Sequence, residues 1–433
     1  MNNNLWLNRM GLLGILFSIT IISCNKDVDS PVANDKPAPS GKSIGKILSE
    51  NSSYSLLLAI ANKVGLAAPL SDSSKTFTLF APDNNAIKQF VSIYTNGAVS
   101  PSFPDTEFLN IISSASPGLT DTLRGIVNYH IIPGQAIKAA AISDTFPSTQ
   151  MPTGVIVPPP ANTNPLVRLT SFISRRGSSA WVNNIPVSAA DFAIASNGVI
   201  HGIPAVLLPP SGNLWQTIIA DPQLSYLKAA IDKADSSALS KDSLGAALRN
   251  FGLNATVFAP TDDAFENFIL EALKSRGVPA PIAQGIIDDN GTNIISNPGS
   301  VTSDLVPNIG AALASVITAR NVKGIIVYHV ISSKNPPHTP PGLRYFSVNF
   351  PTISTLSKTL LNSDTAAPLR NHPGIALAAT FAGPGVTAAT VKGLVNSSAA
   401  NIIVSPPPSN THDLHRLNGV IHKIDQVLLP SPL

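Results

Sequence analysis

The hydrophobic pattern changes along the chain, and the first change lies near the N-terminus. Gly11–Ile22 is a mostly apolar run that follows Arg9. As a helix it spans about 18 Å, which is shorter than the roughly 30 Å hydrocarbon core of a bilayer. We therefore interpret residues 1–23 as a signal peptide. Residues 24–42 are polar and contain several prolines, which predicts a flexible tether ahead of the folded chain.

Apolar residues with helical spacing recur in two matching places. Leu123, Val127 and His130 fall on one face of a helix, and residues 322–329 repeat that spacing. A helix that runs into each histidine would therefore bury it on an apolar face. Polar residues that precede apolar periodic segments predict further helix starts. The expected N-cap residues are Ser43, Asp83, Asp221 and Thr261.

Short β-rich segments predict strands between these helices. Residues 76–80 and 256–258 each run into Ala-Pro, where a paired strand stops. The dipeptide Asn-Gly at positions 197–198 and 418–419 is typical of a tight hairpin turn, because both central residues of that turn need a positive φ. We therefore predict a hairpin in each place, with an alternating strand after the turn.

Three strings recur in the same order in the two halves of the chain. The pairs are TFTLFAPDNNAI (76–87) with NATVFAPTDDAF (254–265), IVNYHII (126–132) with IIVYHVI (325–331), and NGVIHGIPAVLLP (197–209) with NGVIHKIDQVLLP (418–430). Two copies at so long a period predict duplicated domains and not a solenoid. We place the domains at residues 43–209 and 213–433. The second is longer, with insertions at about residues 270–320 and 371–415.

These strings, in this order, resemble the fasciclin-like domain family, which includes the fasciclin/beta-Ig-H3 proteins. The resemblance covers nearly all of residues 43–433. It implies an α+β fold of two tandem fasciclin-like domains, each a wedge-shaped β-sandwich with several packed helices. The first copy departs from the family pattern at Asp83, Ile87 and Pro204, where the second copy keeps the more typical residues. These departures concern the surface of the first domain more than its fold.

The resemblance also suggests binding residues. In the fasciclin family the Tyr-His block is associated with adhesion to cell-surface receptors, which by resemblance points to Tyr129, His130, Tyr328 and His329. The alternative is that each Tyr-His pair packs inside its domain and stabilises it. Helical spacing favours burial of the histidines, while the tyrosines lie off the apolar stripe and could offer their hydroxyl groups.

Cys24 is the only cysteine, so a disulfide framework and a cysteine-based zinc site are excluded. The residues Ile21-Ile22-Ser23-Cys24 resemble the bacterial lipoprotein signal, which implies lipidation of Cys24 and a membrane anchor. The following Asn-Lys-Asp resembles the surface-export signal of Bacteroidetes-type lipoproteins. We therefore expect an outer-membrane lipoprotein exposed on the cell surface, with the periplasmic face as the alternative.

Charge and motifs exclude several function classes. Lys and Arg total 28 and Asp and Glu total 25, so the net charge is only +3, and no basic stripe with interleaved aromatic residues suggests nucleic acid. The motif H-E-x-x-H, the phosphate-binding loop, G-x-G-x-x-G and the EF-hand loop do not occur. We expect no enzymatic activity and no cofactor.

Histidines are the remaining candidates for chemistry. His201 and His422 alternate with aliphatic residues in the predicted strands, and we interpret both as buried structural residues. His412, Asp413 and His415, with His422 nearby, could in principle hold a divalent metal. A proline-rich approach and the lack of a matching set in the first copy favour a polar loop, so we expect no metal. The acidic pairs at 262–263 and 288–289 are interpreted as a helix cap and a solvated turn.

The sequence therefore predicts a cell-surface lipoprotein that mediates adhesion or binding to extracellular matrix, polysaccharide or another cell. Its partners would be a membrane, through Cys24, and an extracellular glycan or surface protein. The two insertions of the second domain are the expected location of the specific contact, because loops on a rigid scaffold carry specificity. The alternative is an accessory binding subunit of an outer-membrane glycan-capture or envelope complex.

Overall fold

The computed structural model describes residues 41–144, 149–157, 164, 166–236, 243–332, 344–363, 366–404 and 412–431. The predicted signal peptide, Cys24 and nearly all of the tether lie outside the described residues. Among the described helices, no single one has both the length and the apolar character to cross a bilayer, although the bent pair Ile309–Val316 and Ala319–Tyr328 meets that test jointly.

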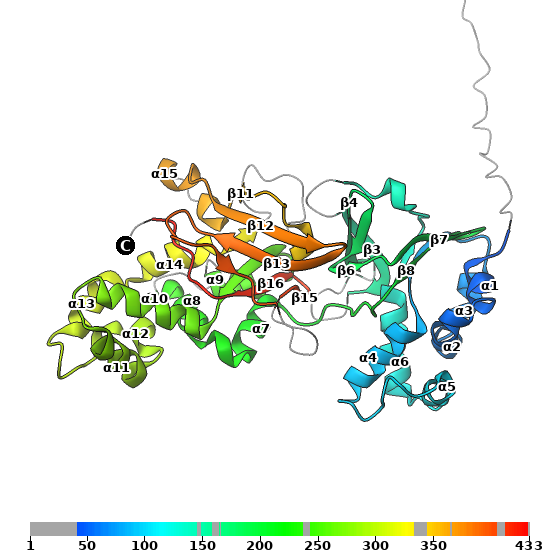
Figure 1. The fold of residues 1–433 in the computed structure, drawn as a ribbon, viewed down its shortest axis with the longest axis horizontal. Helices are drawn as coiled ribbons and strands as arrows, with labels where there is room; N and C mark the ends of the chain where they lie inside the picture. Colours follow the sequence, from blue (N-terminus) through cyan, green and yellow to red (C-terminus); the bar gives the residue numbers. More distant parts are fainter. Residues whose placement is uncertain are drawn as a thin grey trace, which may run out of the picture. The chain divides into compact units, whose positions relative to one another are not determined.

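The first half begins with a group of helices and ends with strands (Figure 1). Its helices are α1 (Ile44–Ser49), η1 (Ser52–Tyr54), α2 (Ser55–Lys63), α3 (Ala67–Ser71), α4 (Asn84–Tyr94), α5 (Asp105–Ser113), α6 (Pro117–Tyr129) and η2 (Ala139–Ala141). Its strands are β1 (Phe77–Pro82), β2 (Ile131–Pro133), β3 (Thr149–Ile156), β4 (Arg168–Arg176), β5 (Ser179–Val182), β6 (Ile185–Pro186), β7 (Ala189–Ala195) and β8 (Gly198–Ile203).

The second half repeats this plan with more helices. They are α7 (Leu214–Ala220), η3 (Pro222–Leu224), α8 (Ser225–Asp235), α9 (Leu244–Arg249), α10 (Asp262–Lys274), α11 (Ala280–Asn290), α12 (Asn293–Ser296), η5 (Pro298–Ser300), α13 (Ile309–Val316), α14 (Ala319–Tyr328), η6 (Ser347–Asn349), η7 (Leu360–Ser363) and α15 (Ala367–Arg370). Its strands are β9 (Ala255–Pro260), β10 (Val330–Ser332), β11 (Thr355–Ser357), β12 (Ile375–Ala382), β13 (Gly385–Lys392), β14 (Ala400–Asn401), β15 (Leu414–Arg416) and β16 (Gly419–Ile424).

Strand order shows that the two halves are copies. The first half has one sheet in the order β2-β1-β8-β7, and the second half has its counterpart in the order β10-β9-β16-β15. In both, the two central strands are parallel and the outer pairs are antiparallel. Each half adds an antiparallel sheet, β3-β4-β5-β6 or β11-β12-β13-β14. The prediction of an α+β fold built from two tandem repeats is therefore confirmed.

Apolar side chains from both sheets of a half pack against each other. Phe80 and Ile203 of the first sheet share a buried cluster with Ile173 and Val182 of the second sheet. A separate, larger cluster fills the space between the first sheet and helices α1 to α6. Each half therefore has a sandwich core and a helical core, and the second half repeats this division.

The predicted helix starts are confirmed by their caps. The side chains of Ser43, Asp83, Thr261 and Asp221 each accept a hydrogen bond from a backbone N–H two or three residues later. These bonds satisfy amide groups that have no partner within the helix. The caps of α4 and α10 fix the helix that comes directly after a central strand of each half.

The Asn-Gly hairpins form, but the predicted turn geometry is wrong. Ala195 pairs with Gly198, so the residues in the turn are Ser196 and Asn197, and Gly198 is the first residue of β8. A Cβ atom on Gly198 would lie 1.9 Å from the carbonyl oxygen of Phe77. The glycine is therefore needed because the parallel neighbour β1 comes so close and because its own φ is +150°, and not for a turn in which both central residues have a positive φ.

The asparagine of each Asn-Gly pair is a buried anchor. Asn197 Oδ1 accepts from the backbone N–H of Ile44 at 2.8 Å, and its Nδ2 donates to the carbonyl of Leu70 at 2.9 Å. Asn418 bonds the N–H of Leu214 and the carbonyl of Leu248 in the same way. Each asparagine thereby joins the hairpin to the first helix of its half.

Candidate functional site

The first Tyr-His pair is buried and fully hydrogen-bonded. His130 Nδ1 lies 2.8 Å from the carbonyl oxygen of Ile126, and its Nε2 accepts from the backbone N–H of Leu207 at 2.9 Å. Burial lowers the pKa of His130 to about 4, so the ring is neutral at neutral pH. Tyr129 Oη donates to the carbonyl of Thr170 at 3.0 Å. The pair therefore joins the end of α6 to the segment after β8 and to the second sheet.

The second pair has the same bonds at equivalent positions. His329 Nδ1 lies 2.8 Å from the carbonyl oxygen of Ile325, and its Nε2 accepts from the N–H of Leu428 at 2.8 Å. Burial lowers the pKa of His329 to about 4. Tyr328 Oη donates to the carbonyl of Gly374 at 2.6 Å, and burial raises its pKa to about 12.

The four binding candidates are therefore interior residues of this structure. Tyr129, His130, Tyr328 and His329 are at most 1% exposed. A receptor would have to reach side chains whose polar atoms already hold the parts of each copy together. Their role in adhesion stays a prediction, and the geometry gives them a structural role.

The strand histidines are buried, as predicted. His201 Nδ1 accepts from the N–H of Asp191 at 3.0 Å, and its Nε2 lies 2.8 Å from the carbonyl of Ile137. His422 bonds the N–H of Asp413 and the carbonyl of Tyr345 in the same arrangement. Both rings are uncharged connectors between a central strand and the segment that covers it.

Of the loop residues, His412 approaches Asp413, with 3.6 Å between Nε2 and Oδ2, and His422 Nδ1 lies 3.8 Å from Asp413 Oδ1, whereas His415 lies apart. Asp413 accepts from the N–H and the hydroxyl of Ser347 at 2.6 and 2.5 Å. His415 instead contacts Arg344, with 2.7 Å between Nε2 and Nη1. No group of three potential metal ligands occurs in the part of the chain that the structure describes.

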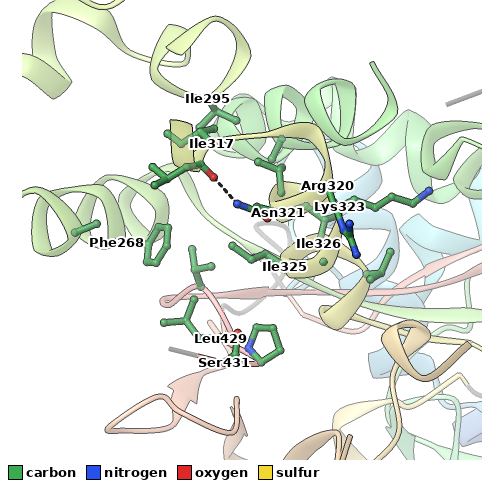
Figure 2. A pocket seen from close by; sticks show the side chains of 18 of the residues that line it. Phe268, Ile295, Ile317, Arg320, Asn321, Lys323, Ile325, Ile326, Leu429 and Ser431 are labelled. Atoms are coloured by element: carbon green, nitrogen blue, oxygen red, sulfur yellow. Dashed lines mark hydrogen bonds between the residues drawn. The ribbon is translucent and has the colours of Figure 1, made fainter. Parts of the chain in front are cut away.

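A pocket of about 830 Å³ lies in the second half. Helices α10, α13 and α14, η7 and the segment after β16 form its walls, and we call it the second-half pocket. Figure 2 shows Phe268 and Ile317 on one side, Ile325 and Ile326 near the centre, and Arg320 on the opposite side. Most of its lining is aliphatic, which is typical of a site for a small apolar molecule. Its aliphatic lining includes Ile269, Ile295, Leu313, Leu360, Leu369, Val427 and Leu429.

The first half has a smaller counterpart. The first-half pocket, of about 90 Å³, lies between the equivalent helices α4 and α6 and includes Ile60 and Tyr94. Ala272 stands at the position of Tyr94, twelve residues after the strand-ending proline in each copy. Ala230 stands at the position of Ile60. Leu56 of α2 donates its backbone N–H to Asn84, and Tyr226 of α8 donates its N–H to Asp262, so residues four positions later, 60 and 230, are equivalent. Two small side chains thus help to open the second-half pocket, and α13 adds a wall.

Three cations lie around this pocket. Arg276, Arg320 and Lys323 are exposed and line it, and we call them the basic rim. None of them forms an ion pair with a residue that the structure describes. In α6 of the first half, Asp121 and Arg124 occupy the positions of Arg320 and Lys323 and form an ion pair with each other. The rim therefore carries positive charge that the first copy neutralises.

The sequence indicated the region but not the pocket. The first insertion, at about residues 270–320, supplies α13, and the second supplies His372. The signal that could have revealed the site is the difference between the copies at matched positions, where Ala replaces Ile or Tyr and Arg replaces Asp.

Comparisons with known proteins match parts of the chain. Residues 52–209 match the fasciclin domain family. The chain is 28% identical over 181 residues to protein sll1483 of Synechocystis sp., which covers 42% of this chain and 81% of that protein. It is also similar to a solved FAS1 domain pair from the insect cell adhesion molecule fasciclin I, with 17% identity, 87% of this chain and 95% of that chain covered, and a TM-score of 0.31.

Proposed function

We propose that the chain is a tethered binding protein of the cell surface, anchored through a lipid on Cys24, whose second half makes the specific contact. The fasciclin-domain match of residues 52–209 supports a role in adhesion or binding. The observation that carries the assignment to the second half is that its first insertion places helices α11 to α13 where the first half has α5, and that it exposes side chains such as Leu305.

Adhesion is the proposed outcome of displaying two such halves on one surface. Weak contacts become firm attachment when several copies engage a ligand together. The ligand of this contact would be an extracellular glycan or a surface protein. Contacts on an insertion would be made by exposed side chains, of which Leu305 is an example at 70% exposure.

A binding array tests this proposal. The chain from Gly41 onward is applied to immobilised glycans, matrix proteins and envelope proteins of the same cell. The variant Leu305→Asp is compared with Leu166→Asp, which changes an exposed leucine of the first half. We expect the first variant to weaken retention and the second to leave it unchanged. Equal retention of both variants would count against the second half as the contact site. Retention only on envelope proteins of the same cell would favour the accessory-subunit alternative.

The anchor needs its own measurement. Mass spectrometry of the mature N-terminal peptide should find Cys24 with acyl chains, and protease treatment of intact cells should remove the chain if it faces outward. A mature protein with an unmodified Cys24 thiol would exclude the lipid anchor.

A further inference from the structure

We propose that the second-half pocket binds an anionic single-chain amphiphile of the long-chain carboxylate class. The alkyl chain lies between α10, α13 and α14, and the carboxylate faces the basic rim. This site is separate from the proposed adhesive contact, and either one can exist without the other.

The shape and chemistry of the pocket favour an alkyl chain. Its volume of about 830 Å³ lies within the range of roughly 300–1,000 Å³ that small-molecule sites occupy. Apart from His372, the only aromatic rings among the described lining residues are Phe265 and Phe268, so there is little surface on which a flat ligand could stack. Aliphatic side chains contribute most of the remaining contacts, and they match methylene groups.

The rim determines the sign of the head group. Arg276, Arg320 and Lys323 line the pocket, and no Asp or Glu is found among its described lining residues. Arg320 and Lys323 are three residues apart on α14, so both side chains emerge on the same side of the helix. A guanidinium matches the two oxygens of a carboxylate with parallel hydrogen bonds, which makes an acidic head group a better partner than a neutral one.

The first half provides an internal reference for this inference. At equivalent positions it has Tyr94 where the second half has Ala272, and it has the Asp121–Arg124 ion pair where the second half has two cations without a described carboxylate partner. The same fold thus has one copy that is narrow and neutral at this place and one that is wide and cationic. Changing the second copy toward the first should remove the ligand site without a foreign side chain.

Calorimetric titration of the full chain with saturated carboxylates of increasing length tests the proposal. We expect the Kd to fall about fourfold for each added methylene until the chain fills the pocket, because each buried methylene contributes a constant free energy. The methyl ester of the best ligand should bind at least about tenfold more weakly, since it has no charge for the rim. Affinity that does not depend on chain length, or equal affinity for the ester, would overturn the inference.

Two variants and two controls locate the site. Ala272→Tyr should block the pocket. Arg320→Gln should raise the Kd of the carboxylate about tenfold and leave the Kd of the ester unchanged. The first control is Lys274→Gln, which also removes one positive charge but at a residue of α10 that does not line the pocket. The second control is Tyr94→Ala, which enlarges only the first-half pocket. Both controls should bind like the wild type, and circular dichroism should show that all four variants are folded. Wild-type affinity in folded Ala272→Tyr would refute the location.

The array of glycans and matrix proteins separates this site from adhesion. If Ala272→Tyr no longer binds the carboxylate but is still retained on the array, the pocket is a ligand site independent of the adhesive contact. If it keeps the carboxylate, the amphiphile site is excluded whatever happens on the array.

Discussion

Buried histidines show how single residues join the parts of each copy. His130 and His329 each connect a helix carbonyl to a backbone N–H near the end of the copy, with both ring nitrogens engaged. The same ring must be neutral, because Nε2 has to accept a bond. Protonation would replace that acceptor with a donor facing another donor, and it would place a charge in the core.

Acid should therefore destabilise the fold through these rings. Burial lowers the pKa of His130 and His329 from 6.5 to about 4 in the folded chain. As the pH falls, the histidines of the unfolded state bind protons before those of the folded state. The two rings therefore contribute fully to the free energy of unfolding above about pH 6.5, and this contribution is lost progressively between pH 6.5 and 4. The loss is on the order of 3 kcal/mol per ring. Urea unfolding at several pH values measures it.

The variant His329→Gln separates this effect from the titration of carboxylates. We expect it to be less stable than the wild type at pH 7, because one of two backbone bonds is lost. Its free energy of unfolding should nevertheless fall less steeply between pH 6.5 and 4.5. An unchanged slope would mean that the ring does not titrate on unfolding in this window.

At the scale of elements, sequence patterns identify local structure well and long-range pairing poorly. Helix caps such as Asp83 and Thr261 follow from local chemistry, and the apolar stripe of α6 follows from its period. The local pattern places the two turn residues at Asn197 and Gly198, one residue too late. The contact that decides the role of Gly198 is with Phe77, more than a hundred residues earlier in the chain. No spacing rule reports such a contact.

The pocket escapes sequence-based prediction for a related reason. Ala230 and Ala272 are ordinary helix residues, and the space they leave appears only when α13 and η7 are placed around them. Matched comparison of the copies would single out these positions, but not the cavity volume. The candidate site is therefore predictable as a region of the second half and not as a set of side chains.

Glycine substitutions test the close approach of the parallel strands. Gly198→Ala should destabilise the chain by about 3 kcal/mol, because its Cβ would meet a backbone oxygen and β1 or β8 must move. Gly125→Ala, in the middle of α6 with no atom within 4 Å of the added Cβ, should be neutral or stabilising by up to about 1 kcal/mol. Thermal unfolding of both variants measures the contrast, and equal Tm values would refute the close-contact explanation.

At the scale of residues 41–433 as a whole, the two halves contact each other through a shared buried cluster. Phe172 and Trp181 of the first half share a buried cluster with Phe346 of the second. Arg344 lies beneath the ring of Phe172, with 5.1 Å from the guanidinium carbon to the ring centroid, and is only 8% exposed. Burial lowers its pKa to about 10, which still leaves it charged at neutral pH.

Arg344 has no carboxylate partner among the described residues and is held by neutral acceptors. It donates to the carbonyl oxygens of Arg416 and Leu417 at 2.9 and 2.6 Å, and to His415 Nε2. Because arginine only donates, His415 Nε2 must be the acceptor, and its Nδ1–H then faces Tyr129 Oη at 3.5 Å. A polar chain thus runs from the second half into the buried tyrosine of the first.

Removing this cation should loosen the contact between the halves. Arg344→Ala leaves several buried acceptors without a donor and removes the contact with Phe172, which should cost about 3 kcal/mol or more. Since the lost bonds lie where the halves meet, we expect denaturant unfolding to separate into two transitions and protease cleavage to rise near residues 209–213. Arg249→Ala is the matched control, because Arg249 covers Trp215 within the second half at 4.2 Å. Arg249→Ala should lower the stability while unfolding stays a single transition. If Arg344→Ala also unfolds in a single transition, at the wild-type midpoint, the halves are held together by the apolar cluster alone.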